Sequence, residues 1–179
     1  MSKDNLNERL VQGVKNMLSK REITQEYFEI KADIGHAFQT KDILIYIPQI
    51  DGQFVSKIKN DIVQLIFSLM TSLRITHAIV LYDQIAPQAR GILSDHSVFE
   101  IEMFKYKMIL FDPTIHEKTP RHILMSREQV EQELPKIKLK DLPRISESDA
   151  IVRFYNWKPD QIVKISRKEG PYYRLISRD

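Results

Sequence analysis

Apolar residues recur at helical spacing in the first part of the chain. Steps of three and four residues connect five of them: Leu6, Leu10, Val14, Met17 and Leu18. This spacing predicts one face of an amphipathic helix that ends near Lys20. Similar steps from Val55 to Leu73 predict a second helix. Because proline is tolerated at the first position of a helix, Pro87 predicts a third, short helix that reaches about Asp95.

Compact runs rich in β-branched residues separate these helices. They predict strands at 28–30, 43–47, 77–82, 98–104 and 108–111. Strands that alternate with helices are typical of an α/β domain. We therefore predict an α/β fold for this part of the chain.

The remaining residues predict a smaller α+β module. Ser126 followed by Gln129 matches the capping-box pattern and predicts a helix from there to Leu134. Asp149 is a suitable cap for a short helix that reaches Tyr155. The runs 161–167 and 172–177 then predict strands that form a closing hairpin.

Charge separates the same two parts. The chain has 179 residues, of which 42% are hydrophobic and 28% charged, as in folded proteins. Residues 1–112 hold 13 Lys and Arg against 14 Asp and Glu, a net charge of −1, whereas residues 113–179 hold 14 against 10, a net charge of +4. We therefore predict a two-part chain with domains at 1–112 and 113–179.

Composition excludes several classes of function. Cysteine is absent, which excludes disulfide frameworks, thiol catalysis and cysteine-ligated zinc. No apolar run approaches the roughly 20 residues of a membrane helix, so we expect no membrane partner. The spacing between His116 and His122 fits no common zinc site, and no glycine-rich phosphate loop is present. We expect no metal and no cofactor.

A metal-dependent nuclease is the enzymatic alternative. Such a site needs a carboxylate and a Glu-x-Lys pair on neighbouring strands. Glu29-Ile30-Lys31 has this local form, but Asp42 follows it instead of preceding it. Glu100 and Glu102 share one face of a strand, yet Lys105 is out of register with them. We therefore expect no catalytic residues, and the nuclease stays an alternative.

Two features of the second part allow a nucleic-acid interpretation. The alternating segment 136–140 is either an exposed edge strand or a solvated linker, and its three lysines either grip phosphates or form a solvated face. Trp157 and Tyr172-Tyr173 either stack on bases or belong to a core. The solvated face and the core are the interpretations we favour.

Residues 115–176 contain motifs of a known family. The family has a motif that begins with His-Glu, continues with two residues that are usually apolar, and then has Pro, any residue and His. In the segment from His116 to Ser126, the motif positions of the two histidines and the proline are occupied by His116, His122 and Pro120. Leu142-Pro143-Arg144-Ile145 precedes Asp149, as in the family's Leu-Pro-Arg-Ile and Asp-Pro-Val-Ala-Arg-Tyr run. These motifs resemble the fifth-largest subunit of eukaryotic nuclear RNA polymerases, whose C-terminal module corresponds to a small subunit of the archaeal polymerase.

The chain departs from this pattern at several positions. Lys118 and Thr119 replace the usual apolar pair, and Ala150 replaces a proline. Asn156 and Asp160 stand where the family usually has glycine, and both residue types tolerate a left-handed backbone. The resemblance extends to the first part through Ile75-Thr76-His77-Ala78-Ile79-Val80 and the turn Ala86-Pro87-Gln88-Ala89-Arg90. The diverged, short chain is compatible with a homologue from a large DNA virus.

The resemblance implies a non-catalytic polymerase subunit. Its first domain would be a nuclease-like α/β jaw that touches downstream duplex DNA without sequence specificity, through Pro87, Gln88, Ala89 and Arg90. Its second domain would assemble on the largest subunit, close to the ω-like small subunit. The implied assembly residues are His116, Pro120, His122, Leu142, Pro143, Arg144 and Ile145. The implied location is the nucleus, or the virion and host cytoplasm for a viral protein. A third possibility is an accessory module that uses the assembly domain on a different scaffold.

Overall fold

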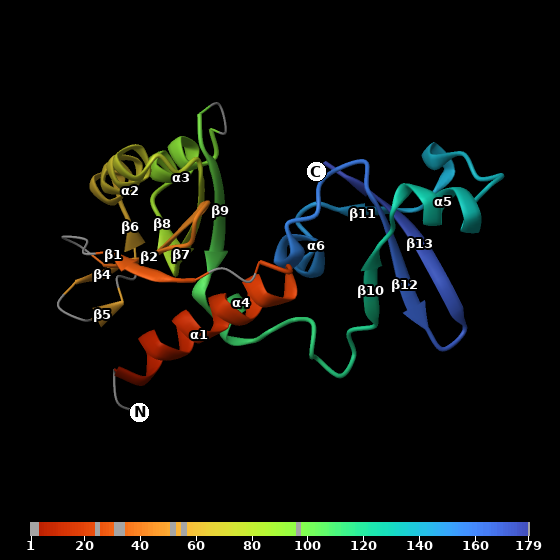
Figure 1. The fold of residues 1–179 in the computed structure, drawn as a ribbon, viewed down its shortest axis with the longest axis horizontal. Helices are drawn as coiled ribbons and strands as arrows, with labels where there is room; N and C mark the ends of the chain where they lie inside the picture. Colours follow the sequence, from red (N-terminus) through yellow and green to blue (C-terminus); the bar gives the residue numbers. More distant parts are fainter. Residues whose placement is uncertain are drawn as a thin grey trace. The chain divides into compact units, whose positions relative to one another are not determined.

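The computed structural model describes residues 4–23, 26–30, 35–50, 53–54, 57–95 and 98–178. These residues form two compact units, Met1–Phe111 and Asp112–Asp179, here called unit 1 and unit 2 (Figure 1). Both units combine helices with sheets, as expected for a two-part chain of α/β and α+β character. Among the described residues, no helix is long and apolar enough to cross a membrane.

Unit 1 is built on a mixed five-stranded sheet in the order β1-β2-β3-β7-β9. Strands β3, β7 and β9 are parallel, and β1 and β2 continue the sheet in antiparallel pairing. The strands are β1 (Phe28–Ile30), β2 (His36–Gln39), β3 (Ile43–Ile47), β7 (His77–Tyr82) and β9 (Glu100–Lys105). All five residues of β3 are buried, which is the pattern of a strand covered on both faces.

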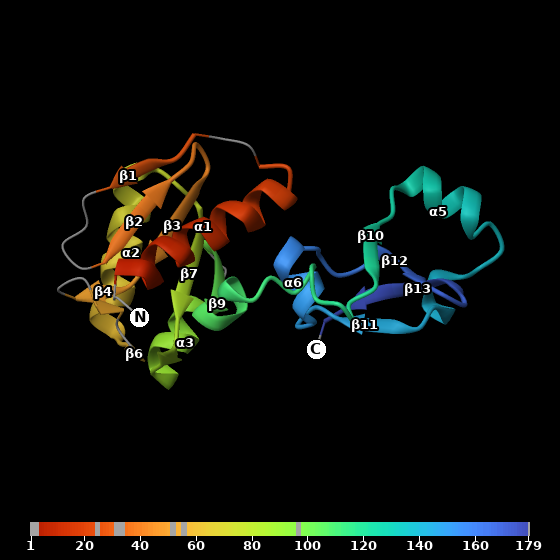
Figure 2. The ribbon, with the colours of Figure 1, turned by 90° about the horizontal axis from the view of Figure 1, so that it is seen from below.

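Helices cover the two faces of this sheet. On one face, α2 (Asn60–Leu73) and α3 (Pro87–Leu93) pack on alternate strand residues such as Leu44 and Val80. On the other face, α1 (Asp4–Lys20) and α4 (Tyr106–Leu110) pack together and against the sheet (Figure 2). The short pairs β4 (Gln49–Ile50) with β5 (Gln53–Phe54) and β6 (Lys57–Ile58) with β8 (Gln84–Ile85) complete the unit.

Most predicted elements of unit 1 are confirmed, and two are corrected. The second helix begins at Asn60 and not at Val55: Ile58 lies in β6, and Val55 is outside the described residues. The strand predicted at 108–111 is wrong, because these residues lie in and just after α4. Gly13 of α1 explains the fit of this helix. A Cβ on Gly13 would lie 2.7 Å from Ile109 Cγ2, so only glycine allows the two helices to approach so closely.

Unit 2 is built on a four-stranded sheet in the order β10-β12-β13-β11. The strands are β10 (Arg121–Leu124), β11 (Arg144–Ser146), β12 (Ile162–Arg167) and β13 (Gly170–Ser177). One face packs under α5 (Arg127–Glu133), with Leu134, Leu142, Ile162 and Leu175 in its core. The other face packs under α6 (Ala150–Tyr155), with Val152, Val163, Ile165 and Ile176 in its core.

Local signals in unit 2 are confirmed in detail. Ser126 and Gln129 form a capping box at the start of α5, and the Asp149 carboxylate accepts hydrogen bonds from the first backbone N–H groups of α6. Asn156 and Asp160 have φ angles of 54° and 68°, so both adopt the left-handed conformation that glycine would otherwise supply.

The alternating segment 136–140 is not a strand. It consists of a turn followed by the short 3₁₀ helix η1 (Leu139–Asp141), which agrees with the linker interpretation. The closing hairpin turns at Lys168-Glu169, and its second strand begins at Gly170, two residues before the predicted start at 172.

Candidate functional site

The predicted DNA-contact residues lie on the first turn of α3. Pro87 occupies a first-turn position, and Ala86 before it provides no side-chain cap. Pro87, Gln88 and Arg90 are exposed, but Ala89 is fully buried in the core of unit 1. The Ala89 side chain therefore packs inside the domain and cannot face a DNA backbone, because one side of this short helix must cover the sheet.

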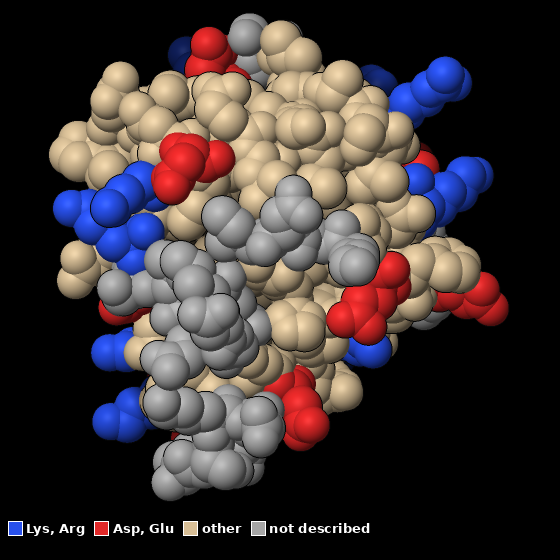
Figure 3. All heavy atoms as spheres, turned by 90° about the vertical axis from the view of Figure 1, so that its left-hand side faces the viewer, with Lys and Arg blue, Asp and Glu red and all other residues tan. Residues whose placement is uncertain are grey.

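Arg90 is the cation of this turn. Its guanidinium carbon lies 5.6 Å from the ring centroid of Tyr82, which is 5% exposed. This cation–π contact favours one orientation of the guanidinium, and Arg90 as a residue is exposed. The face of unit 1 in Figure 3 is mainly uncharged, with basic and acidic side chains scattered over it.

A buried ionic cluster lies elsewhere in unit 1, at the edge strand β9. The Arg21 guanidinium donates hydrogen bonds to both carboxylate oxygens of Glu102, each at 2.8 Å. His77 Nε2 donates to the same carboxylate, also at 2.8 Å. The side chains of Arg21 and Glu102 are only 4% and 10% exposed. The cluster ties the end of α1 to β7 and β9.

Electrostatics keep Glu102 ionised. Burial acts to raise its pKa, but the hydrogen bonds and charges of His77 and Arg21 outweigh burial, so the pKa lies below the usual value. Its oxygens are already committed to three N–H donors. Glu102 is therefore occupied by a structural role and not available to hold a metal ion or activate water.

The two separate candidate sites of the nuclease alternative, one at Glu29 and one at Glu102, do not combine into one. Glu29 lies on β1, at the opposite edge of the five-stranded sheet from Glu102 on β9. Four interstrand steps of about 4.8 Å separate the two strands by roughly 19 Å, too far for one metal ion. Across the described ranges, no group of three or more His, Asp or Glu side chains could hold a metal ion.

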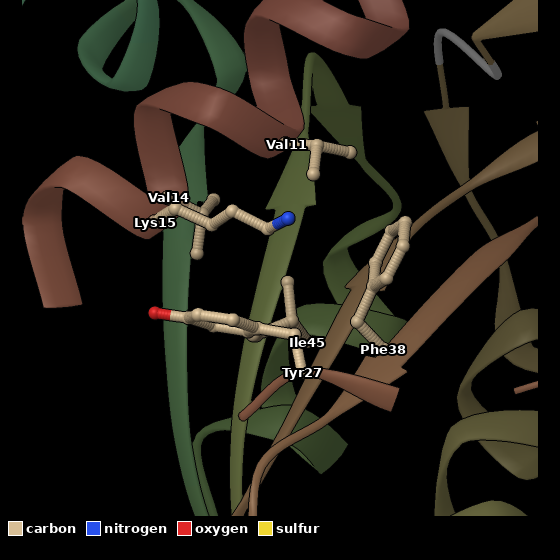
Figure 4. A pocket seen from close by; sticks show the side chains of 6 residues that line it. All are labelled: Val11, Val14, Lys15, Tyr27, Phe38 and Ile45. Carbon is tan, nitrogen blue, oxygen red and sulfur yellow. The ribbon is translucent and has the colours of Figure 1, made fainter. Parts of the chain in front are cut away.

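The cavity under α1 is too small for a ligand. Val11, Val14 and Lys15 of α1 close over Tyr27, Phe38 and Ile45 (Figure 4). The enclosed space is about 10 Å³, room for about one water molecule. Lys15 Nζ lies 5.0 Å from the Tyr27 ring centroid, so its cation covers the ring and not a binding site.

The first family motif of unit 2 lies on and before the edge strand β10. His116 Nδ1 accepts a hydrogen bond from the Lys118 backbone N–H at 3.2 Å, which closes a tight turn. His122 Nδ1 donates to the Pro120 carbonyl oxygen at 2.7 Å. Each histidine thus uses one ring nitrogen to shape the chain. His116 is exposed, whereas His122 and Pro120 are half-buried.

The second family motif lies on the opposite edge strand, β11. The Leu175 N–H donates to the Pro143 carbonyl, and the Arg174 side chain donates to the Arg144 carbonyl, each at 2.9 Å. Pro143 and Arg144 are exposed, and Ile145 is half-buried against the α6 side of the sheet. Leu142 is only 7% exposed. Leu142 is therefore a core residue and does not offer its side chain to a partner.

The aromatic residues of unit 2 divide between core and surface. Trp157 packs on the α6 core and stacks on Tyr155, with ring centroids 4.7 Å apart, so the core interpretation is confirmed for it. Tyr173 packs on the α5 core, and its hydroxyl donates to Glu133 at 2.6 Å. Tyr172 is 46% exposed, with the Arg167 guanidinium carbon 5.4 Å from its ring centroid.

Sequence reasoning missed the roles of Arg21 and His77. A charged Glu102 inside the otherwise apolar strand Ile101–Phe104 was the available signal, since a buried carboxylate requires cationic partners. Nothing in the sequence identified which cations these were, because Arg21 is 81 positions away.

Comparisons with known proteins agree with the motifs. Residues 111–176 match the family described as RNA polymerase Rpb5, C-terminal domain. The chain is 28% identical over 144 residues to a subunit of DNA-directed RNA polymerases I, II and III, rpabc1, of Dictyostelium discoideum, and the match covers 77% of this chain and 71% of the relative.

Further relatives match over shorter stretches. Subunit RPABC1 of DNA-directed RNA polymerases I, II and III from Caenorhabditis briggsae is 33% identical over 106 residues, covering 55% of this chain and 50% of the relative. Subunit 5A of DNA-directed RNA polymerase V from Arabidopsis thaliana is 34% identical over 90 residues, covering 49% of this chain and 40% of the relative. The chain thus spans half or less of these two relatives.

All three relatives are named as parts of an enzyme complex, a DNA-directed RNA polymerase. Their names support the predicted polymerase subunit, and none of them supports a nuclease. Residues 111–176 match the Rpb5 C-terminal domain, and the resemblance of this chain to the fifth RNA polymerase subunit is confirmed.

Proposed function

We propose that the chain is a non-catalytic subunit of a multisubunit DNA-directed RNA polymerase, with one protein-binding and one DNA-facing domain. Unit 2 is the assembly domain, which docks on the largest subunit beside the ω-like small subunit. Unit 1 is the jaw domain, which braces the enzyme near downstream duplex DNA. The nucleus is the corresponding location, or the virion and host cytoplasm for a viral protein.

The observation that carries the assembly role is the placement of the two family motifs. They occupy β10 and β11, the two edge strands of one sheet, within the segment that matches the Rpb5 C-terminal domain. Edge strands present backbone and side-chain groups to a partner. Arg144 on β11 is exposed, as are His116 before β10 and Pro143 just before β11, and the net positive charge of residues 113–179 favours an acidic partner surface.

The jaw role is supported by the architecture and charge of unit 1. Its mixed sheet with helices on both faces is compatible with a nuclease-like fold, and its former candidate carboxylate Glu102 is held by Arg21 and His77. Residues 1–112 carry a net charge of −1, so long-range attraction to DNA is absent. The contact through Gln88 and Arg90 would be weak in isolation and sequence-independent.

Co-purification tests the assembly role. A tagged chain expressed in its native source should retain the large polymerase subunits, identified by mass spectrometry. Arg144→Glu should weaken this retention, because it places a carboxylate on the exposed edge of β11. Arg90→Glu, the same change on unit 1, should not. Absence of polymerase subunits with the wild-type chain would overturn the assignment.

DNA retention tests the jaw role in the assembled enzyme. Arg90→Glu should reduce the salt-dependent retention of downstream duplex DNA, and the slope of log retention against log salt should fall by about one for one lost phosphate contact. Arg9→Glu makes the same charge change at an exposed position of α1. Equal slopes for both variants and the wild type would refute a DNA contact at Arg90.

A further inference from the structure

Residues 136–140 form an exposed segment of unit 2, a turn followed by the start of η1, here called the lysine loop. Its sequence is Lys-Ile-Lys-Leu-Lys, and all five residues are exposed. Ile137 and Leu139 are each 46% exposed, although folding normally buries such side chains. The loop therefore displays two aliphatic side chains between three cations.

The lysine loop is held in place at both ends. Leu134 before it and Leu142 after it are 6% and 7% exposed and belong to the same hydrophobic core. Within the loop, the Ile137 N–H donates to the Leu134 carbonyl, and the Asp141 N–H donates to the Lys138 carbonyl. A loop fixed in this way loses little conformational entropy when it binds a partner.

The combination of side chains selects the class of partner. Lysines alone would suit phosphates, but exposed aliphatic side chains gain nothing from a DNA backbone. An acidic protein segment that also carries apolar residues satisfies both sets, since it pairs with the lysines and removes Ile137 and Leu139 from water. We propose that the lysine loop is a docking site for an acidic, apolar segment of another polymerase subunit.

This inference rests on the proposed assembly role and changes where its apolar contacts lie. The sequence placed them at Leu142 and Ile145, but Leu142 is in the core and Ile145 packs under α6. Ile137 and Leu139 reach the surface, as does Pro143 of the motif itself. They provide the partner with the apolar contacts that Leu142 cannot.

The test compares two sets of variants in the full chain. Ile137→Ser with Leu139→Ser removes the apolar contacts, and Lys136→Glu with Lys138→Glu and Lys140→Glu reverses the charge. Each set has a control in unit 1. The control for the apolar set is Phe28→Ser, at an apolar residue that is 54% exposed. The control for the charge set is the replacement of the exposed Lys57, Lys59 and Lys105 by glutamate. The fluorescence of Trp157, the single tryptophan, verifies that unit 2 is folded.

Each variant is co-purified with the polymerase from nuclease-treated extract, at salt from about 0.1 to 0.5 M. Both lysine-loop sets should lower retention of the large subunits about tenfold at the higher salt, and both controls should match the wild type. Binding to tiled peptides of the largest subunit, measured by fluorescence anisotropy, should identify acidic and apolar segments and should fail with either loop set.

The outcomes separate the two proposals. If the wild-type chain retains no polymerase subunits, the proposed function itself fails. If it retains them and both loop sets do so equally well, the docking site is refuted while the assembly role stands. Two results would show that the lysine loop binds nucleic acid and would overturn the protein-docking proposal. One is that nuclease treatment abolishes retention of the polymerase subunits. The other is that the lysines bind a 30-base-pair duplex probe while no tiled peptide is bound.

Discussion

The two units contain the same kind of polar cluster in opposite environments. In unit 1, Glu102 joins Arg21 and His77, and the ionic side chains Arg21 and Glu102 are at most 10% exposed. In unit 2, Glu133 joins Lys164 and Tyr173, with oxygen contacts of 2.6 to 2.9 Å. The Lys164 and Glu133 side chains are 28% and 33% exposed.

From this difference we expect burial, and not contact distance, to decide how much each carboxylate cluster contributes to stability. Water can solvate Glu133 when its partners are removed, whereas the Arg21 side chain, only 4% exposed, is poorly placed to be solvated when Glu102 is removed. Unit 1 therefore uses its charges internally to hold α1 against the sheet. Unit 2 keeps its carboxylate cluster at the surface, in contact with solvent.

The largest expected effect is that of Glu102→Ala on the stability of unit 1. Removing this carboxylate leaves the Arg21 cation buried without its two charged hydrogen bonds. We expect a loss of about 3–5 kcal/mol in the free energy of unfolding, measured by urea denaturation with hydrogen exchange of β7 and β9 amides.

Glu133→Ala is the matched control for this change. It removes the carboxylate from the exposed cluster and should lower stability far less, measured by Trp157 fluorescence in unit 2. If Glu102→Ala and Glu133→Ala lowered the free energy of unfolding equally, burial would not be what sets the contribution of each carboxylate cluster.

Acid should separate the two clusters further. The pKa of Glu102 is lowered in the folded chain, so its contribution to stability is complete above the unfolded value, about 4.3, and is lost as the pH falls through the folded pKa. Unit 1 of the wild type should lose stability as the pH falls below this value, and Glu102→Gln should show a shallower loss. The measurement is urea denaturation followed across the acid range.

Salt provides the second axis of this experiment. Hydrogen bonding to Lys164 and Tyr173 also lowers the pKa of Glu133, but this cluster is in contact with solvent. Comparison of the wild type with Glu133→Gln gives the part of the pH dependence of unit 2 stability that is due to Glu133. About 1 M NaCl should suppress this part. The pH dependence of unit 1 stability that is due to Glu102 should stay largely intact. Salt sensitivity at Glu102 equal to that at Glu133 would show that the unit 1 cluster is open to water.

The sequence predicts elements well where a side chain fixes its own neighbourhood. The Ser126 capping box, the Asp149 cap and the left-handed Asn156 depend on residues at most three positions away. Their chemistry can be evaluated without knowledge of the fold. The periodic helix that ends at Lys20 and the buried strand at 43–47 belong to the same class, because their patterns are long or strongly apolar.

Prediction from sequence fails where a residue distant in the sequence determines the conformation or burial of a segment. The run at 108–111 is too short to distinguish helix from strand by periodicity, and its helix depends on space above Gly13. Leu142 is apolar and next to an edge strand, which suits either a core or an interface; only packing with Leu134 and Leu175 decides between them. For the same reason the sequence identified Glu102 but not its partners.

The Asp149 cap allows a smaller test within unit 2. Asp149→Ala removes hydrogen bonds to the Ile151 and Val152 N–H groups, and we expect a loss of about 1 kcal/mol. Trp157 fluorescence measures it directly, because Trp157 packs on the core that contains Val152. Glu147→Ala, two positions earlier, should have no effect, and the β7 and β9 amides of unit 1 should exchange as in the wild type.

The smallest effect compares one backbone conformation in the two units. Arg74 after α2 and Asn156 after α6 have the same left-handed angles, φ 55° and 54° with ψ 36° in both. Arginine is strained there by its Cβ, whereas asparagine tolerates this region. Arg74→Gly should therefore stabilise unit 1 by a few tenths to about 1 kcal/mol, after the entropy that glycine adds to the unfolded chain.

Asn156→Gly should change the stability of unit 2 less, because asparagine already relieves most of the strain and its side chain accepts a hydrogen bond from Lys158 Nζ at 2.9 Å. Urea denaturation of both variants measures the difference. A larger gain from Asn156→Gly than from Arg74→Gly would mean that this asparagine is strained like any other residue. In that case the residue type at the helix end would not determine the strain. The left-handed backbone conformation, which both helix ends have in common, would determine it instead.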